Sequence, residues 1–127
     1  MGTAPKTMEL LKTLFAAGIA HSDLALHFHD TYGQALVNVL VSLEQGIRTF
    51  DSAVSGLGGC PFAGPGASGN VSTEELVYTF QTLGVETGID LDEMSRIGGW
   101  ISEKLGRSHE SPVGKAVLSR LKRTDSS

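Results

Sequence analysis

The sequence contains a single cysteine, Cys60, four prolines and few aromatic side chains. One cysteine excludes an internal disulfide, so Cys60 is either a small buried residue or a reactive thiol, and a reducing compartment suits both. No apolar run approaches the roughly 20 residues that a membrane-spanning helix needs. The amino terminus has neither the apolar core of a signal peptide nor an Arg-rich transit pattern. We therefore expect no membrane partner.

Basic residues are also scarce, and the formal net charge is -4. The basic residues that do cluster, Arg120, Lys122 and Arg123, lie near the polar carboxyl terminus. Nucleic acid is therefore not an expected partner, because binding it requires a basic face. With 127 residues, of which 40% are hydrophobic, the chain is long enough to bury one core.

The spacing of apolar residues predicts an α/β fold. A helix is expected from Lys6 to about Ala20, and a second between Gly33 and Gly46. Strands are expected from Leu24 to His29 and from Ile47 to about Ala53. The order strand, helix, strand predicts a parallel crossover unit whose strands are buried on both faces.

Three more helices are expected beyond residue 70. The pairs Ser72 with Glu75 and Asp90 with Glu93 have capping-box spacing, and Ser111-Pro112 opens the last helix. Gly98-Gly99 should weaken the middle helix of the three. The predicted apolar faces of the first two are Leu76, Val77, Phe80 and Leu83, and Met94, Ile97, Ile101 and Leu105.

Two parallel strands do not form a stable sheet alone. Either further strands come from another chain, or the sequence is a piece of a larger α/β protein. An eight-stranded α/β barrel takes about 250 residues, which favours the second interpretation and identifies the chain as the carboxyl-terminal end of such a barrel.

Two histidines, His27 and His29, stand one residue apart at the end of the first predicted strand. Because strand side chains alternate between faces, both histidines project to one side and Phe28 to the other. Adjacent neutral imidazoles bind divalent metals, whereas the alternative is a pair that hydrogen-bonds to solvent or a carboxylate. Active sites of parallel α/β proteins lie at the carboxyl ends of strands, and this position favours the metal site.

A glycine-rich segment from Ser55 to Asn70, with six glycines and two prolines, leaves the second strand at the same end. Glycines such as Gly58 and Gly59 allow a ligand to approach the main chain closely. Within this segment Cys60 is either a catalytic acid or base or an inert thiol. Asn70 is either a helix cap or an amide ligand that completes a metal site.

These residues resemble one family closely. The segments His27-Phe28-His29-Asp30-Thr31-Tyr32-Gly33-Gln34-Ala35, Asp51-Ser52-Ala53-Val54-Ser55-Gly56-Leu57-Gly58-Gly59-Cys60-Pro61-Phe62-Ala63 and Gly66-Ala67-Ser68-Gly69-Asn70 resemble hydroxymethylglutaryl-CoA lyases. The histidine pair is shared with other DRE-TIM metallolyases, and the cysteine loop marks the lyase branch. An acyl transferase of the same superfamily would share the histidines without this loop.

The resemblance implies a TIM barrel that cleaves 3-hydroxy-3-methylglutaryl-CoA into acetoacetate and acetyl-CoA, with Mg²⁺ or Mn²⁺ as activator. It implies that His27, His29 and Asn70 are metal ligands, that Cys60 is the catalytic thiol, and that Gly58 and Gly59 form the substrate loop. The expected compartment is the mitochondrial matrix in a eukaryote and the cytoplasm in a bacterium. Residues 1–84 would form the partial barrel, 85–123 a helical extension and 124–127 a tail.

Part of the family's site is not encoded in these residues. The family carries an acidic metal ligand beside a catalytic arginine at the end of its first strand, and the chain has no counterpart of that strand. We therefore expect weak metal binding and little turnover by the 127 residues alone. The alternative function is a non-catalytic module that pairs with itself or with a full-length chain through unsatisfied strand edges.

Overall fold

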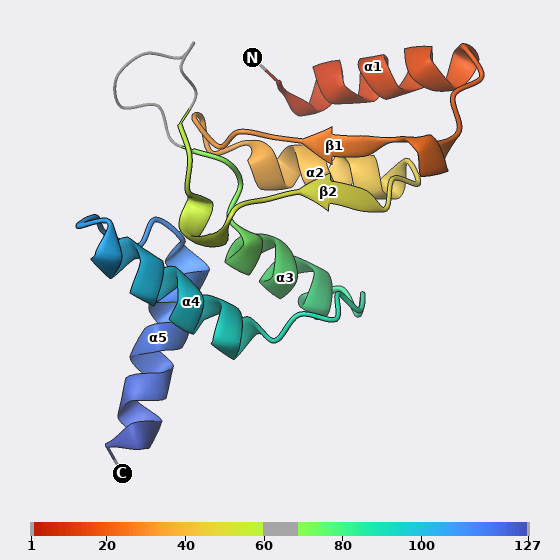
Figure 1. Cartoon of the computed structure of the whole chain (residues 1–127). Helices are drawn as coiled ribbons and strands as arrows, with labels where there is room; N and C mark the ends of the chain where they lie inside the picture. The colour runs from red at the N-terminus through yellow and green to blue at the C-terminus, as the bar shows by residue number, and fades with distance from the viewer. Residues whose placement is uncertain (1, 60–68, 127) are drawn as a thin grey trace. The chain divides into compact units, whose positions relative to one another are not determined.

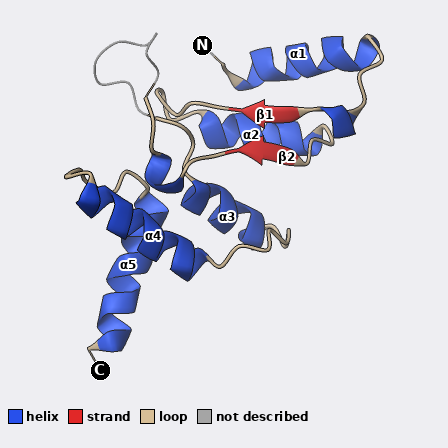
Figure 2. Ribbon diagram, in the orientation of Figure 1, coloured by secondary structure: helices blue, strands red, loops and turns tan. Residues whose placement is uncertain are grey.

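The computed structural model describes residues 2–59 and 69–126 (Figure 1). The chain divides into two compact units. The first comprises Met1–Ser52 and Gly59–Val71, and the second comprises Ala53–Gly58 and Ser72–Ser127. Strands occur in the first unit and the second unit is helical (Figure 2). The predicted α/β class is therefore confirmed.

The first unit contains α1 (Ala4–Ala16), β1 (Ala25–His27), α2 (Ala35–Glu44) and β2 (Thr49–Asp51). The two strands are parallel, and Leu26 pairs with Phe50 in the register. Helix α2 connects them, as the predicted crossover unit requires, and ends before Gly46, whose φ is +94°. A positive φ is the conformation that glycine adopts at the end of a helix without steric cost.

The core of the first unit lies where α1 and α2 pack against each other. Leu11, Val39 and Ile47 are fully buried there. The Asn38 side chain donates a hydrogen bond of 3.2 Å to the carbonyl oxygen of Gly2, which ties α2 to the start of the chain. Helix α1 is shorter than expected and ends at Ala16, shortly before Gly18 with its φ of +86°.

The strands differ from the prediction in length and burial. Each has three residues, and in each the outer two are exposed while the central residue is half-buried. The expectation that both faces are buried is wrong. Among the described residues the sheet has only two strands, so each of them is an edge strand.

The second unit contains the short 3-10 turn η2 (Val54–Gly56) and the helices α3 (Thr73–Thr82), α4 (Leu91–Lys104) and α5 (Pro112–Asp125). The predicted caps are confirmed, because Ser72, Asp90 and Ser111 each accept a backbone N–H bond at a helix start. Helix α5 reaches Asp125, so Thr124 and Asp125 are helical, unlike the expected tail. None of the described helices is long and apolar enough to cross a membrane.

The buried face of α4 is not the predicted apolar one. Ile97 and Leu105 are 48% and 56% exposed, whereas Ser95, Gly98 and Ser102 are buried. A Cβ added at Gly98 would lie 2.3 Å from an oxygen of Glu74, so close packing requires glycine at this position. Leu83, also predicted to be internal, is 54% exposed after the last turn of α3.

Candidate metal site and buried polar cluster

His27 and His29 lie together at the carboxyl end of β1. His27 is the last residue of the strand, and its ring centroid lies 5.1 Å from that of His29, with the rings inclined at 53°. Both residues are exposed. The structure therefore brings the two imidazoles together on one side of the chain, as the period-two spacing predicts.

Asn70 lies opposite His29. The two residues form an antiparallel bridge, flanked by hydrogen bonds from Asp30 N to Gly69 O at 3.2 Å and from Val71 N to Phe28 O at 3.1 Å. This pattern makes His29 and Asn70 a non-hydrogen-bonded pair, in which Cα atoms stand about 4.5 Å apart and side chains are close. The three predicted metal ligands thus meet at one end of the first unit.

Asp51 joins them, although the spacing of the histidines gives no sign of it. It is the last residue of β2 and the register partner of His27. Its Oδ2 lies 3.4 Å from Nδ1 of His27. The signal that could have found it is topological, because carboxyl ends of adjacent parallel strands lie at one edge. We refer to His27, His29, Asp51 and Asn70 as the strand-end cluster.

The strand-end cluster fits a divalent cation in its donor types. Imidazole nitrogens and an amide oxygen are ordinary ligands of such cations, and the neighbouring carboxylate of Asp51 adds the negative charge that the ligands lack. Among residues 2–59 and 69–126 no three His, Cys, Asp or Glu side chains are grouped to hold a metal. The imidazoles of His27 and His29 and the amide of Asn70 are therefore candidate ligands only.

The predicted loop residues are only partly described. Gly58 and Gly59 are exposed, and Gly58 has a φ of +100°, a conformation that favours glycine. Cys60 lies outside the described residues, so its catalytic role stays a prediction.

A second group of polar residues lies inside the second unit. Ser55, Glu74, Ser102, His109 and Ser111 are all buried, and we refer to them as the buried cluster. Both carboxylate oxygens of Glu74 accept the backbone N–H of Ser55, at 3.0 and 2.9 Å. Ser55 is the one non-glycine residue with positive φ among those described, at 55°. Glu74 therefore holds a backbone conformation that a serine rarely adopts.

His109 connects the rest of the buried cluster. Its Nδ1 accepts the backbone N–H of Ser111 at 3.2 Å and lies 3.1 Å from Oγ of Ser55. An Nδ1 that accepts a backbone N–H carries no proton, so the neutral ring has its proton on Nε2. Nε2 lies 3.3 Å from Oε1 of Glu74 without forming a well-aligned hydrogen bond.

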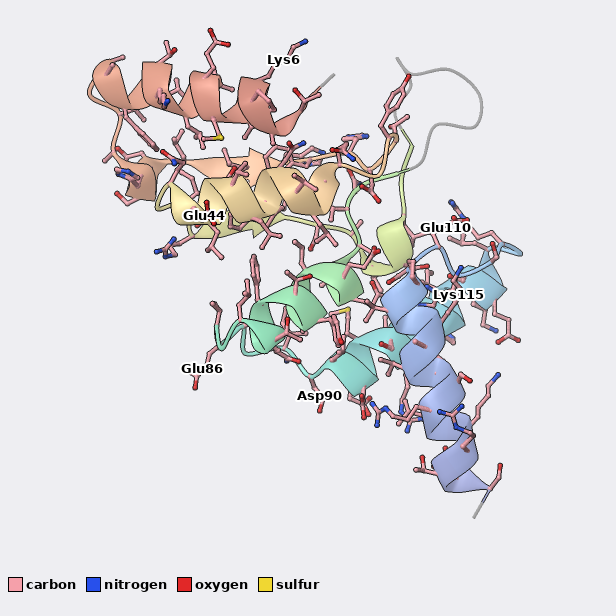
Figure 3. All side chains as sticks on the ribbon, turned by 180° about the vertical axis from the view of Figure 1, so that it is seen from behind. Lys6, Glu44, Glu86, Asp90, Glu110 and Lys115 are labelled. Atoms are coloured by element: carbon pink, nitrogen blue, oxygen red, sulfur yellow. The ribbon has the colours of Figure 1, made fainter. Side chains whose placement is uncertain are left out.

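Burial dominates the protonation of both groups. It raises the pKa of the Glu74 carboxyl above its usual 4.5, against the lowering effect of the backbone N–H groups of Glu74 and Ser55. Burial also lowers the pKa of His109 below its usual 6.5, and Lys115 acts in the same direction while Glu110 opposes it. Figure 3 labels Lys115 and Glu110 on the second unit. The pKa shifts of Glu74 and His109 both favour the neutral forms of these groups.

The buried cluster has the residue types of a hydrolytic triad but not its accessibility. Ser55 and Glu74 have no exposed surface. Gly98 and Gly114 pack directly on the imidazole, since a Cβ at Gly114 would lie 2.3 Å from Cε1 of His109. A nucleophile that no substrate can reach does not catalyse hydrolysis. The buried cluster is therefore a structural element that joins η2, α3 and α4 to the start of α5.

The amino-acid sequence matches the sequence model of one family, described as HMGL-like, over residues 1–101. This chain belongs to the HMGL-like family. The HMGL-like chain is 48% identical over 122 residues to hydroxymethylglutaryl-CoA lyase of Pseudomonas mevalonii. These residues make up 96% of the chain and 40% of that protein. It is 47% identical over 121 residues to the mitochondrial hydroxymethylglutaryl-CoA lyase of Arabidopsis thaliana, covering 95% of the chain and 25% of that protein.

Solved structures agree with the sequence comparison. The hydroxymethylglutaryl-CoA lyase of Pseudomonas aeruginosa superposes with a TM-score of 0.88 at 45% identity, over 94% of the HMGL-like chain and 39% of that structure. A lyase from Acinetobacter baumannii, in complex with coenzyme A and 3-methylmalate, gives a TM-score of 0.83 at 41% identity, over 91% and 37%. The resemblance to hydroxymethylglutaryl-CoA lyases is confirmed, and the chain spans between 25% and 40% of the curated relatives named above.

Proposed function

We propose that this chain is the metal-binding portion of a hydroxymethylglutaryl-CoA lyase, which cleaves 3-hydroxy-3-methylglutaryl-CoA into acetoacetate and acetyl-CoA with Mg²⁺ or Mn²⁺. The observation that carries the proposal is the meeting of His27, His29 and Asn70 at the carboxyl end of β1 in a chain of the HMGL-like family. An acyl-CoA substrate is further supported by the coenzyme A bound to the A. baumannii relative.

In this proposal His27, His29 and Asn70 hold the cation and Cys60 handles a proton. A divalent cation supplies positive charge that polarises the hydroxyl and carbonyl oxygens of the substrate. Loss of the substrate hydroxyl proton and carbon–carbon cleavage give acetoacetate and leave the acetyl-CoA part as an enolate, which must take up a proton. The Cys60 thiol gives that proton or orients the group that does, and Gly58 and Gly59 allow the main chain to approach the substrate.

The proposal includes the place of the chain in the fold. Residues 1–84 would provide the last two strands and helices of a (β/α)8 barrel, with residues 85–123 as a helical extension. The TM-score of 0.88 to the P. aeruginosa lyase, of which the chain covers 39%, supports this assignment. The proposed compartment is the mitochondrial matrix in a eukaryote and the cytoplasm in a bacterium.

A chimaera tests the catalytic assignment. The matching 39% of the P. aeruginosa lyase is replaced by this chain, and acetoacetate formation is measured with Mg²⁺ or Mn²⁺. We expect turnover that falls by two or more orders of magnitude, to about 10⁻² or less, with His29→Ala, Asn70→Ala or Cys60→Ala. The matched control is His21→Ala, which removes an exposed histidine that stacks on Phe15. An active chimaera whose turnover resists all three substitutions would contradict the proposed ligands and thiol.

The second candidate is a non-catalytic module that pairs with a second copy or with a full-length chain. The exposed outer residues of β1 and β2 favour it, because an uncovered parallel pair presents edges for association. The isolated chain should then melt at a temperature that rises with protein concentration and elute as a dimer from gel filtration. A concentration-independent melt of a monomer counts against pairing, and robust acetoacetate formation by the isolated chain counts against any non-catalytic role.

A further inference from the structure

The carboxylate of Asp51 faces an imidazole that the proposed site uses. In the parallel register His27 and Asp51 are directly paired, and paired residues of adjacent strands project to the same face. The distance from Nδ1 of His27 to Oδ2 of Asp51 is 3.4 Å, a contact that, like the one between His109 and Glu74, is not a well-aligned hydrogen bond. Both residues end their strands, so the strand register sets the separation of their backbones.

A neutral imidazole has one N–H and one lone pair, and only the nitrogen with the lone pair binds a metal. The hydrogen bond made by one nitrogen decides which nitrogen remains for the metal. A carboxylate accepts but does not donate, so Asp51 favours the form of His27 with its proton on Nδ1. Nε2 of His27 is then left with the lone pair.

We infer that Asp51 is a positioning residue that holds His27 in its Nδ1–H form and so presents Nε2 to the divalent cation. The inference rests on the proposed function, because it assigns a purpose to the orientation of a proposed ligand. Carboxylates that hold a metal-binding histidine in this way fix the ring and raise the basicity of the ligating nitrogen.

Two features of the strand-end cluster support a positioning role over a simple surface ion pair. The His29 ring, whose centroid lies 5.1 Å from that of His27, requires His27 to keep a defined orientation if one cation is to contact both. The side chains of His27 and Asp51 are 50% and 61% exposed, so the pair contributes little to folding. Its chemical consequence is the choice of ring nitrogen.

The first test is made without metal. The chain is labelled with ¹⁵N at histidine, and long-range ¹H–¹⁵N correlations at about pH 8, above the usual histidine pKa, report which nitrogen of each ring carries the proton. We expect His27 in the Nδ1–H form in the wild type, a shift toward the Nε2–H form in Asp51→Ala, and partial retention in Asp51→Asn, whose amide oxygen still accepts. Asp23→Ala, which removes an exposed carboxylate of the same unit, is the matched control and should leave His27 unchanged.

The second test measures binding of Mn²⁺ alone by electron paramagnetic resonance in the chimaera described above, which supplies the remaining part of the lyase. Asp51→Ala should weaken binding by about 10- to 100-fold, and Asp51→Asn less, as for loss of a group that orients a ligand. Circular dichroism confirms that each variant is folded.

The outcomes separate the inference from the proposed function. An Nε2–H ring in the wild type, or a His27 form that Asp51→Ala does not change, overturns the inference. Equal Mn²⁺ affinity of wild type and Asp51→Ala overturns it as well and leaves the metal site standing. If His27 is held in the Nδ1–H form but the chimaera binds no Mn²⁺, both the proposed site and the purpose inferred for Asp51 are contradicted.

Discussion

The two units each contain a histidine beside a carboxylate, and the two pairs lie in opposite environments. In the strand-end cluster the side chains of His27 and Asp51 are 50% and 61% exposed. In the buried cluster those of His109 and Glu74 are 7% and 0% exposed. The first pair can be reached by a ligand, whereas the second is enclosed by Gly98 and Gly114.

Exposure decides what each pair can do. Water screens the charges of the strand-end cluster, so it contributes little to stability while its nitrogen and oxygen donors remain available. Burial in the second unit penalises the charged forms of Glu74 and His109, so every hydrogen bond that satisfies them counts toward stability. Similar residue types therefore provide a candidate ligand site in one unit and an internal support in the other.

Gly98→Ala should produce the largest loss of stability. The new Cβ would lie 2.3 Å from Oε1 of Glu74 and 2.5 Å from Nε2 of His109, in a cluster that has no room to shift. We expect a loss of about 3 kcal/mol in the free energy of unfolding, at the upper end for overpacking. Urea denaturation monitored by circular dichroism measures it.

The matched control for this substitution is Gly99→Ala in the same helix. Its Cβ would meet the side chain of Leu118, whose Cδ1 would lie 2.9 Å away, and the end of that flexible side chain can move aside. Alanine also favours a helix over glycine by about 1 kcal/mol, so the net change should be near zero. Equal destabilisation by Gly98→Ala and Gly99→Ala would mean that the buried cluster is not the cause.

Glu74→Gln should have the next largest effect. The amide keeps the shape of the side chain but replaces one of the two oxygens that accept the Ser55 N–H with a donor. We expect a loss of about 2 kcal/mol, since the buried amide NH₂ would face the N–H groups of Ser55 and His109 and find no acceptor. Glu86→Gln, at an exposed position of the same unit, is the control and should change little. An unchanged unfolding midpoint for Glu74→Gln would show that the carboxylate is dispensable.

Local signals in the sequence predict much of this fold. The caps Ser72, Asp90 and Ser111 follow from residue types at fixed spacing, and all three are confirmed. The parallel strand pair follows from the order of elements and is confirmed as well. Such features depend on interactions between residues that are near in sequence or on general topology, and this is why one chain suffices to predict them.

Contacts between residues that are far apart in the sequence account for the features that the sequence does not predict. Ser55 contacts His109 across 54 positions, and no spacing rule connects them. The sequence predicts that the apolar stripe is the buried face of α4, because within the helix alone Gly98 only lowers helix propensity. The close packing of Gly98 against Glu74 is a tertiary contact that no local pattern shows. In the strand-end cluster the histidine spacing is local and predictable, but the register that brings Asp51 to His27 exists only in the folded sheet.

Stability should depend on pH through His109. Its pKa is lowered by burial, so as the pH falls through the usual 6.5 the unfolded chain takes up a proton that the folded chain refuses. Stability therefore declines toward acid, by up to about 1.4 kcal/mol for each pKa unit of lowering. The decline is complete once the pH is below the folded pKa. Protonation at Nδ1 would also break the bond from Ser111 N.

His109→Asn tests this dependence, because its Oδ1 still accepts at the place of Nδ1 but does not titrate. Thermal melts between about pH 7.5 and about pH 5 should show a shallower decline for the variant than for the wild type. The raised pKa of Glu74 acts in the opposite direction and is retained in both chains, so it largely cancels in the difference. Parallel pH profiles of the two chains would assign the acid sensitivity elsewhere.

Asp51→Asn should have the smallest effect on stability. A small effect is expected because the strand-end cluster, unlike the buried cluster, is exposed. The contact between Asp51 and His27 spans 3.4 Å between exposed side chains, where an interaction contributes from zero to about 1 kcal/mol. We expect a change within about 0.5 kcal/mol in urea denaturation at low salt, and less at about 1 M salt, where screening is stronger. A loss as large as that of Glu74→Gln would mean that the strand-end cluster supports the fold in the way the buried cluster does, and that exposure alone does not separate a ligand site from a structural one.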